Sequence, residues 1–91
     1  MRSSLKPLAG RRVRFAARFG HVSIGGNILL RDLEGPGGIE RHMWIPGNRW
    51  PGKLMLPDAE IWFSARVGAY NRQRGGWDFG LLDIEIEGAR P

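Results

Sequence analysis

Arginines and aromatic residues recur in this chain at alternating positions, the spacing that places side chains on one face of an extended strand. A guanidinium group neutralises phosphate, and a flat ring stacks on a base whatever the identity of that base. The residues that could do this chemistry are Arg12, Arg14, Arg18, Trp44, Trp62, Arg66, Tyr70, Arg72, Arg74 and Trp77. Their pattern favours binding to the backbone and bases of single-stranded nucleic acid.

Residues for catalysis, metal binding or phosphate-loop chemistry are missing or badly spaced. The chain has no cysteine, and His21 and His42 lack the carboxylate–histidine spacing of a zinc site. No serine has a glycine elbow beside it, and the glycine-rich run 35–38 lacks the Gly-Lys-Ser/Thr ending of a phosphate loop. We therefore expect no enzymatic activity, no metal and no cofactor.

The charge of the chain is unevenly distributed. Lysine and arginine number 14 against 9 aspartates and glutamates, which gives a formal net charge of +5. Residues 1–20 carry six basic residues and no acid, whereas residues 78–91 carry four acids and one arginine. A basic domain attracts polyanions. No apolar run approaches the roughly 18 residues of a spanning helix, so we expect a cytoplasmic protein that makes no membrane contact.

Short runs of alternating polarity, separated by 14 glycines and 6 prolines, predict a single all-β domain of five strands. The predicted strands cover residues 11–24 with a bend at Gly20, then 28–33, 39–45, 60–70 and 77–87. In the first and fourth strands the inward side chains are Val13, Phe15, Ala17 and Phe19, and Ile61, Phe63, Ala65, Val67 and Ala69. In the fifth they are Leu82, Ile84 and Ile86. The ordered core spans about residues 10–87 of the single domain 1–91, with loose ends at 1–8 and 88–91.

Five short strands, a first strand interrupted by glycine and a basic glycine-rich loop before the last strand resemble the oligonucleotide/oligosaccharide-binding (OB) fold, a closed or partly open barrel. Within this pattern, "EIWFSARVGAYNR…WDFGL" looks like the passage from fourth to fifth strand in small single-stranded-DNA-binding proteins of bacteria and mobile elements. The connection between the third and fourth strands departs from that fold, because it carries Pro46, Pro51 and Pro57 in place of a helix. An SH3-like barrel is the alternative five-stranded fold.

Two different binding surfaces follow from this pattern. If the first and fourth strands are neighbours that close the barrel, the arginines of the first strand lie beside Trp62, Arg66 and Tyr70. The resemblance to the OB fold instead implies binding on the outer faces of the second and third strands and on the loops next to them. The loop 72–77 belongs to both surfaces. Periodicity does not decide whether Trp44 faces outward.

Two further interpretations compete with a nucleic-acid site. Asp83, Glu85 and Glu87 share one face of the fifth strand, and pairing with the arginines would neutralise the basic patch. A basic barrel that docks on an acidic protein, as an accessory or inhibitor subunit, would also use arginine and tryptophan in its interface. We expect a protein that binds single-stranded DNA, or RNA, with little sequence preference, in replication, recombination, plasmid transfer or phage biology. The sequence leaves open whether it forms a homodimer.

Overall fold

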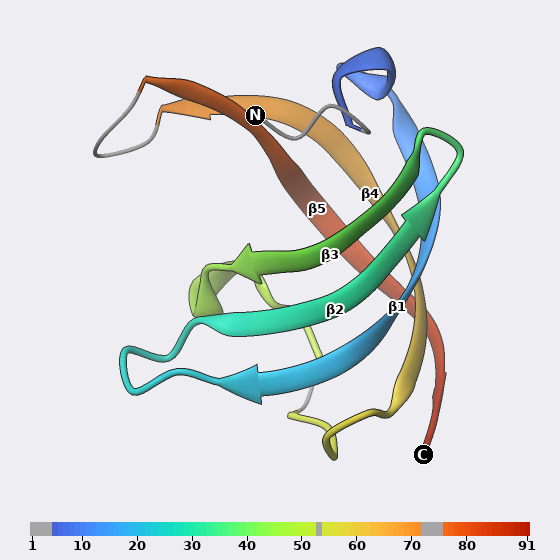
Figure 1. Cartoon of the computed structure of the whole chain (residues 1–91), viewed down its shortest axis with the longest axis vertical. Helices are drawn as coiled ribbons and strands as arrows, with labels where there is room; N and C mark the ends of the chain where they lie inside the picture. Colours follow the sequence, from blue (N-terminus) through green and yellow to red (C-terminus); the bar gives the residue numbers. More distant parts are fainter. Residues whose placement is uncertain (1–4, 53, 72–75) are drawn as a thin grey trace.

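The computed structural model describes residues 5–52, 54–71 and 76–91, and for residues 70 and 71 it describes the backbone alone. Five antiparallel strands make up most of the chain (Figure 1), which confirms the predicted all-β class. Their bounds are β1 Arg12–Val22, β2 Ile28–Gly35, β3 Gly38–Ile45, β4 Glu60–Asn71 and β5 Trp77–Arg90. Two short 3-10 turns, η1 at Lys6–Leu8 and η2 at Gly47–Arg49, are the described helical elements. None of the described helices is long and apolar enough to span a membrane.

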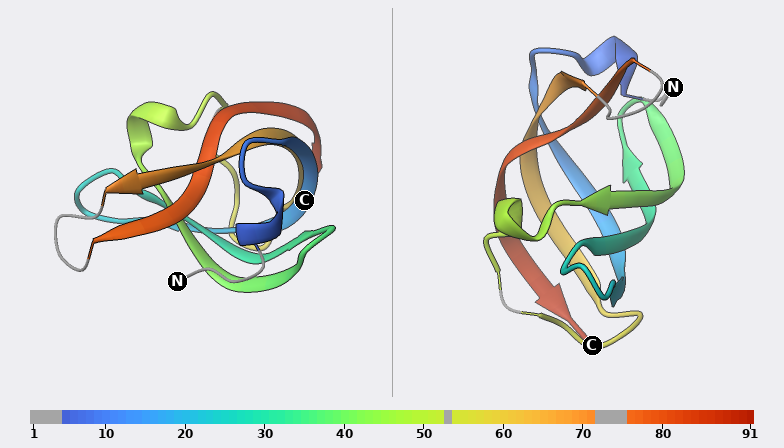
Figure 2. Two further views of the ribbon diagram at one scale, coloured as in Figure 1. Left: turned by 90° about the horizontal axis from the view of Figure 1, so that it is seen from above. Right: turned by 90° about the vertical axis from the view of Figure 1, so that its left-hand side faces the viewer.

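The strands form one sheet in the order β3-β2-β1-β4-β5. β1 and β4 pair side by side, as the sequence predicts, but this pair lies in the middle of the sheet and does not close it. β3 and β5 are the two edges, and the sheet curls so that it encloses the core like an open barrel (Figure 2).

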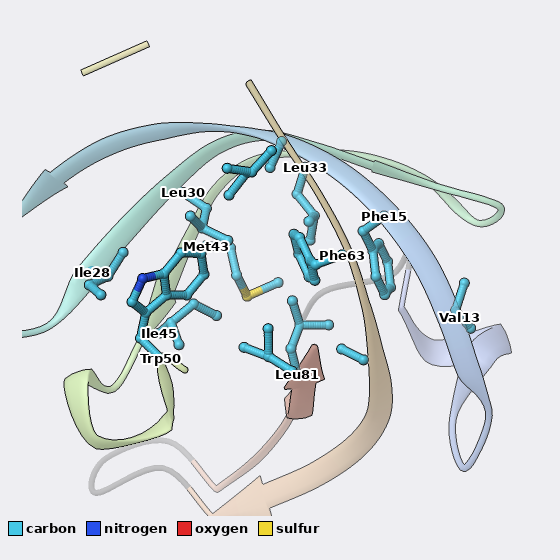
Figure 3. Close-up of a cluster of buried hydrophobic side chains, with 14 of the residues drawn as sticks. Val13, Phe15, Ile28, Leu30, Leu33, Met43, Ile45, Trp50, Phe63 and Leu81 are labelled. Atoms are coloured by element: carbon cyan, nitrogen blue, oxygen red, sulfur yellow. The ribbon is translucent and has the colours of Figure 1, made fainter. Parts of the chain in front are cut away.

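Alternating apolar residues on β1 and β4 form the centre of the core (Figure 3). Phe15 pairs with Phe63 in the register of the two strands, and their rings stack with centroids 5.6 Å apart. Both rings are buried, and the predicted inward residues of these strands are buried as well, except for Ala69, which is exposed near the end of β4. At Gly20 the β1–β2 pairing shifts register and a side chain would meet the Leu29 carbonyl oxygen at 2.8 Å, so the predicted bend requires glycine.

The predicted inward face of β5 was wrong in part. Leu81 and Ile84 are buried, whereas Leu82 is half-buried. The cause is an extra residue in β5 between the pairs Ser64↔Glu85 and Arg66↔Leu82. Asp83 in this segment has a φ of 50°, a left-handed conformation that aspartate tolerates better than most residues. Because strand faces alternate every residue, one inserted residue reverses which side chains point inward.

The two ends of the chain are more ordered than predicted. Leu5 and Leu8 are 2% and 4% exposed and belong to the core, so η1 covers one end of the barrel with apolar side chains. At the other end, β5 continues through Gly88 to Arg90 and pairs with the start of β4. The prediction of loose ends is therefore wrong for residues 5–8 and 88–90.

The proline-rich connection between β3 and β4 is anchored by a tryptophan. Trp50 is 8% exposed, and its ring centroid lies 6.1 Å from that of Phe19. This burial makes Trp50 part of the core, where it packs the connection against the sheet. The loop also contains η2, which places Arg49 at the surface.

Candidate nucleic-acid interface

The outer face of β1, β4 and β5 brings together the arginines and the tryptophan that the sequence singles out; we call this surface the arginine wall. Arg12 pairs with Arg66 across the strands, Arg14 with Ser64, and Ala16 with Trp62. Trp62 is 37% exposed. The predicted row of guanidinium groups beside an exposed ring is therefore present, with Arg12, Arg14 and Arg18 on one strand.

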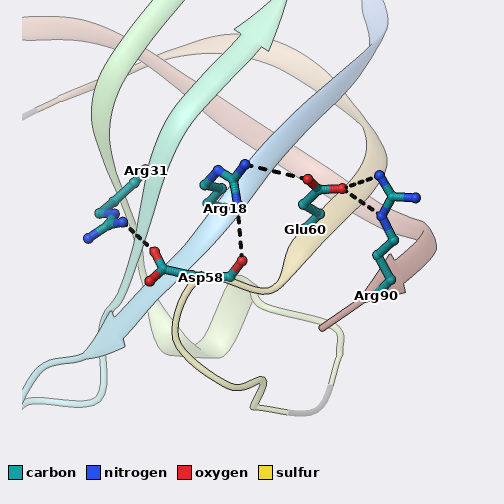
Figure 4. Close-up of polar contacts among 5 residues, drawn as sticks. All are labelled: Arg18, Arg31, Asp58, Glu60 and Arg90. Carbon is teal, nitrogen blue, oxygen red and sulfur yellow. Dashed lines mark hydrogen bonds and ion pairs between the residues drawn. The ribbon is translucent and has the colours of Figure 1, made fainter.

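Each arginine of this wall is bound to an acid of the same chain. The contacts are Arg12–Glu85 at 3.2 Å, Arg14–Glu87 at 3.4 Å, Arg66–Asp83 at 3.0 Å, Arg18–Glu60 at 3.4 Å and Arg90–Glu60 at 2.7 Å. Figure 4 shows Glu60 between the last two arginines. Arg14 and Glu85 lie on either side of the small Ser64, so side chains from β1 and β5 can meet over β4. A phosphate on this wall would have to compete with these carboxylates for the arginines.

The surroundings of Trp62 are also occupied by the protein itself. The Arg90 guanidinium carbon lies 5.4 Å from the centroid of the indole ring, and Gly88 pairs with Trp62 and lies against its edge. The adjacent hollow of about 280 Å³ is lined by three acids, Asp32, Glu34 and Glu60, and by two arginines. Carboxylates at this density repel a nucleic-acid backbone, which makes Trp62 a poor stacking site.

The outer face of β1, β2 and β3 has a different composition. The strand pairing aligns His21, Leu29 and Trp44 in one row and Arg18, Arg31 and His42 in the next. The rings of His21 and Trp44 meet edge to face, with centroids 5.7 Å apart, and Leu29 is 8% exposed between them in the row. We call the residues His21, Leu29, Arg31, His42 and Trp44 the Trp44 face.

The pairing of β2 with β3 decides the orientation that periodicity left open. Met43 and Ile45 are each 1% exposed and point into the barrel, so Trp44 points outward and is 45% exposed. His42 is exposed beside Arg31. An exposed indole next to basic side chains is the arrangement that stacks a base while holding its phosphate.

A cleft of about 230 Å³ opens beside Trp44; we call it the Trp44 cleft. Its lining residues are Asn27, Trp44, Ile45, Pro46, Arg49, Gly80 and Leu81. It lies between the end of β3 and the edge strand β5. In Figure 1 the β1–β2 loop lies on the same side of the molecule as the end of β4 and the start of β5, below and above the end of β3.

The basic groups around this cleft differ from those of the arginine wall. Arg49 lines the cleft, is exposed and makes no ion pair with any residue in the described part of the chain. Arg41 is also exposed, but it lies on the face of β3 that carries Met43 and Ile45, opposite Trp44. Arg31 is paired with Asp58, which also accepts a hydrogen bond from Arg18 through its main-chain oxygen (Figure 4). Among the described residues, the guanidinium group that lines this cleft without an acidic partner is therefore that of Arg49.

Sequence reasoning missed most of this surface. It singled out Trp44 but not the residues around it, which are His21, Asn27, Arg31, His42 and Arg49. The signal that could have found them is the register of β2 against β3, which sets Leu29 opposite Trp44 and Arg31 opposite His42. Arg49 had a weaker signal, as a base within a loop of prolines and glycines next to the third strand.

The remaining predicted residues belong to the β4–β5 hairpin. Trp77 is 66% exposed at the start of β5. Tyr70 pairs with Asp78 through the backbone, and its side chain lies outside the described part of the structure. Arg72 and Arg74 also lie outside the described residues. Their predicted role in binding stays a prediction.

Comparison of the chain with protein-family models, with curated proteins and with solved structures gives no match. Within the described residues, no group of three or more histidine, aspartate or glutamate side chains is placed to hold a metal ion.

Replacing Gly47 by alanine is expected to disturb the Trp44 cleft. A β-carbon at this position would lie 2.2 Å from the main-chain oxygen of Gly26, so η2 and the β1–β2 loop would have to separate. We expect a loss of about 1–3 kcal/mol in the free energy of unfolding, measured by urea denaturation. The control is Gly25→Ala, whose β-carbon meets only the Ser23 hydroxyl at 3.9 Å and which should change stability by less than about 0.5 kcal/mol. Equal effects of the two substitutions would contradict the close contact.

Proposed function

We propose that this protein binds single-stranded nucleic acid, DNA in preference to RNA, on the Trp44 face and along the Trp44 cleft. The observation that carries the proposal is an exposed Trp44 ring, steadied by His21, next to an open cleft lined by Arg49, which has no acidic partner among the described residues. Stacking on the indole holds a base, and guanidinium groups hold the flanking phosphates.

The shape of the sheet supports an OB-like assignment. A five-stranded, partly open barrel of this kind binds oligonucleotides on the outer faces of its second and third strands and on the loops after the first and fourth. The Trp44 face lies on β2 and β3, and the β1–β2 loop contributes Asn27 to the cleft. The preference for DNA, a cytoplasmic location and a role in replication, recombination, plasmid transfer or phage biology rest on the resemblance to small single-stranded-DNA-binding proteins. We propose that the protein acts by binding and not as an enzyme.

The proposal favours the Trp44 face over the arginine wall because carboxylates of the same chain neutralise the arginines of the wall. Its exposed ion pairs contribute little to stability, about 0–1 kcal/mol each, but they lower the positive potential that a phosphate would meet. Among the described basic residues of the Trp44 face, Arg31 alone is paired with a carboxylate, which is that of Asp58.

Titration with a 20-nucleotide oligo-dT tests the proposal. Tryptophan emission is expected to be quenched at low salt as a base stacks on Trp44. If Arg31 and Arg49 neutralise about two phosphates, the logarithm of the affinity falls against the logarithm of salt concentration with a slope of about −1.4. Absence of binding at low salt, or an affinity independent of salt, would contradict the proposal. The first of these results would favour an acidic protein as the partner.

A further inference from the structure

The Trp44 cleft has the size and lining of a site for a single base. Its volume of about 230 Å³ is many times the roughly 10–15 Å³ that a cavity needs to hold one water molecule, so a group much larger than water fits. Trp44, Ile45 and Leu81 give it apolar walls, and Gly80 contributes no side chain to its β5 side. A flat aromatic ring fits such a space better than a phosphate does, because apolar walls do not compensate the loss of water around a charge.

The polar groups of the cleft lie together on one side. Ile28 pairs with Ile45, so Asn27 lies next to Pro46, and Arg49 follows one turn of η2 later. The close approach of Gly47 to Gly26 fixes this side of the cleft before any ligand binds. Neither the Asn27 carboxamide nor the Arg49 guanidinium has a partner among the described residues, so both are free to bind the edge of a base.

We propose that this cleft selects guanine in the bound strand; this inference rests on the proposed nucleic-acid function and adds a base preference to it. Arginine offers two parallel donors, and guanine presents two neighbouring acceptors, O6 and N7. The donor N1–H of guanine is adjacent to O6, within reach of an acceptor such as Asn27 Oδ1. Adenine and thymine have no two neighbouring acceptors, because the N6 amino group of adenine and the N3–H of thymine adjoin their acceptors, so half of the arginine fork is left unpaired.

Cytosine is the closest competitor for the cleft. Its O2 and N3 atoms also accept two hydrogen bonds, and its N4 amino group donates one. The larger purine ring covers more of the Trp44 indole, so guanine gains more from stacking and is the base that the cleft favours.

Competition among four matched 12-nucleotide strands tests this preference. Each strand is oligo-dT with one central position changed to dG, dC or dA or left as dT, and affinity is measured by fluorescence anisotropy. We expect the dG strand to bind about 5- to 100-fold more tightly than plain oligo-dT, the effect of one bidentate contact. In Arg49→Lys, which keeps the charge but loses the fork, the ratio of dG-strand affinity to oligo-dT affinity should fall to about one.

The outcomes separate this inference from the proposed function. Equal binding of all four strands would overturn guanine selection and leave nucleic-acid binding intact. A preference for dC, or a dG preference that survives both Arg49→Lys and Asn27→Ala, would overturn the assignment of the cleft. Failure of every strand to bind would overturn the proposed function and the inference together.

Discussion

Replacing Trp44 by alanine is expected to weaken binding of oligo-dT by about 5- to 150-fold, because a stacked base contributes about 1–3 kcal/mol. The substitution removes the ring that packs against His21 and one wall of the Trp44 cleft. Since Trp44 is 45% exposed and outside the core, the variant should remain folded. Fluorescence anisotropy with a labelled oligonucleotide measures the change, and circular dichroism verifies the fold.

The matched control is Trp62→Ala on the arginine wall. Trp62 is 37% exposed, similar to Trp44, but it lies beside Arg90 and the acids of the 280 Å³ hollow. We expect its replacement to change the affinity by less than about two-fold, since a solvated contact outside the binding surface adds little. A large loss in Trp62→Ala together with a small one in Trp44→Ala would move the binding site to the arginine wall.

Replacing Phe63 by alanine is expected to lower the free energy of unfolding by about 3–5 kcal/mol, the range for a buried aromatic side chain. Phe63 is fully buried and stacks on Phe15 at the centre of the sheet. Small domains have only about 5–15 kcal/mol of total stability, so the variant would be close to unfolding. Urea denaturation followed by tryptophan fluorescence measures the loss.

The control for Phe63→Ala is the same substitution at a large apolar residue that is not buried in the core. Ile24 is fully exposed in the β1–β2 turn, and its replacement by alanine should alter stability by about 0.5 kcal/mol or less. A Phe63→Ala variant that lost less than about 1 kcal/mol would contradict the account of the core.

Much of the fold could be predicted because apolar and outward-facing residues alternate regularly in the segments that form β1 and β4. In β1 and β4 the apolar residues occupy every second position, and their burial follows from the geometry of a strand. β5 could not be predicted in the same way, since the left-handed Asp83 and the residue inserted beside it reverse the inward face. Leu5 and Leu8 were missed because two leucines in a short polar segment carry no periodic signal.

The candidate site was harder to predict, because its electrostatics depend on the order of strands in space. The sequence concentrates bases in residues 1–20 and acids in residues 78–91, which suggests a strongly basic surface. The fold places β4 alone between these two segments, so Arg12 and Arg14 meet Glu85 and Glu87. Charges that are segregated along the chain thus become mixed on the arginine wall.

The indole N–H signals of the four tryptophans in an NMR spectrum of ¹⁵N-labelled protein test the central claim most directly. On titration with oligo-dT, we expect the signal of Trp44 to shift strongly, while those of Trp62 and the buried Trp50 stay nearly in place. A strong shift of Trp62 with an unchanged Trp44 signal would contradict the account.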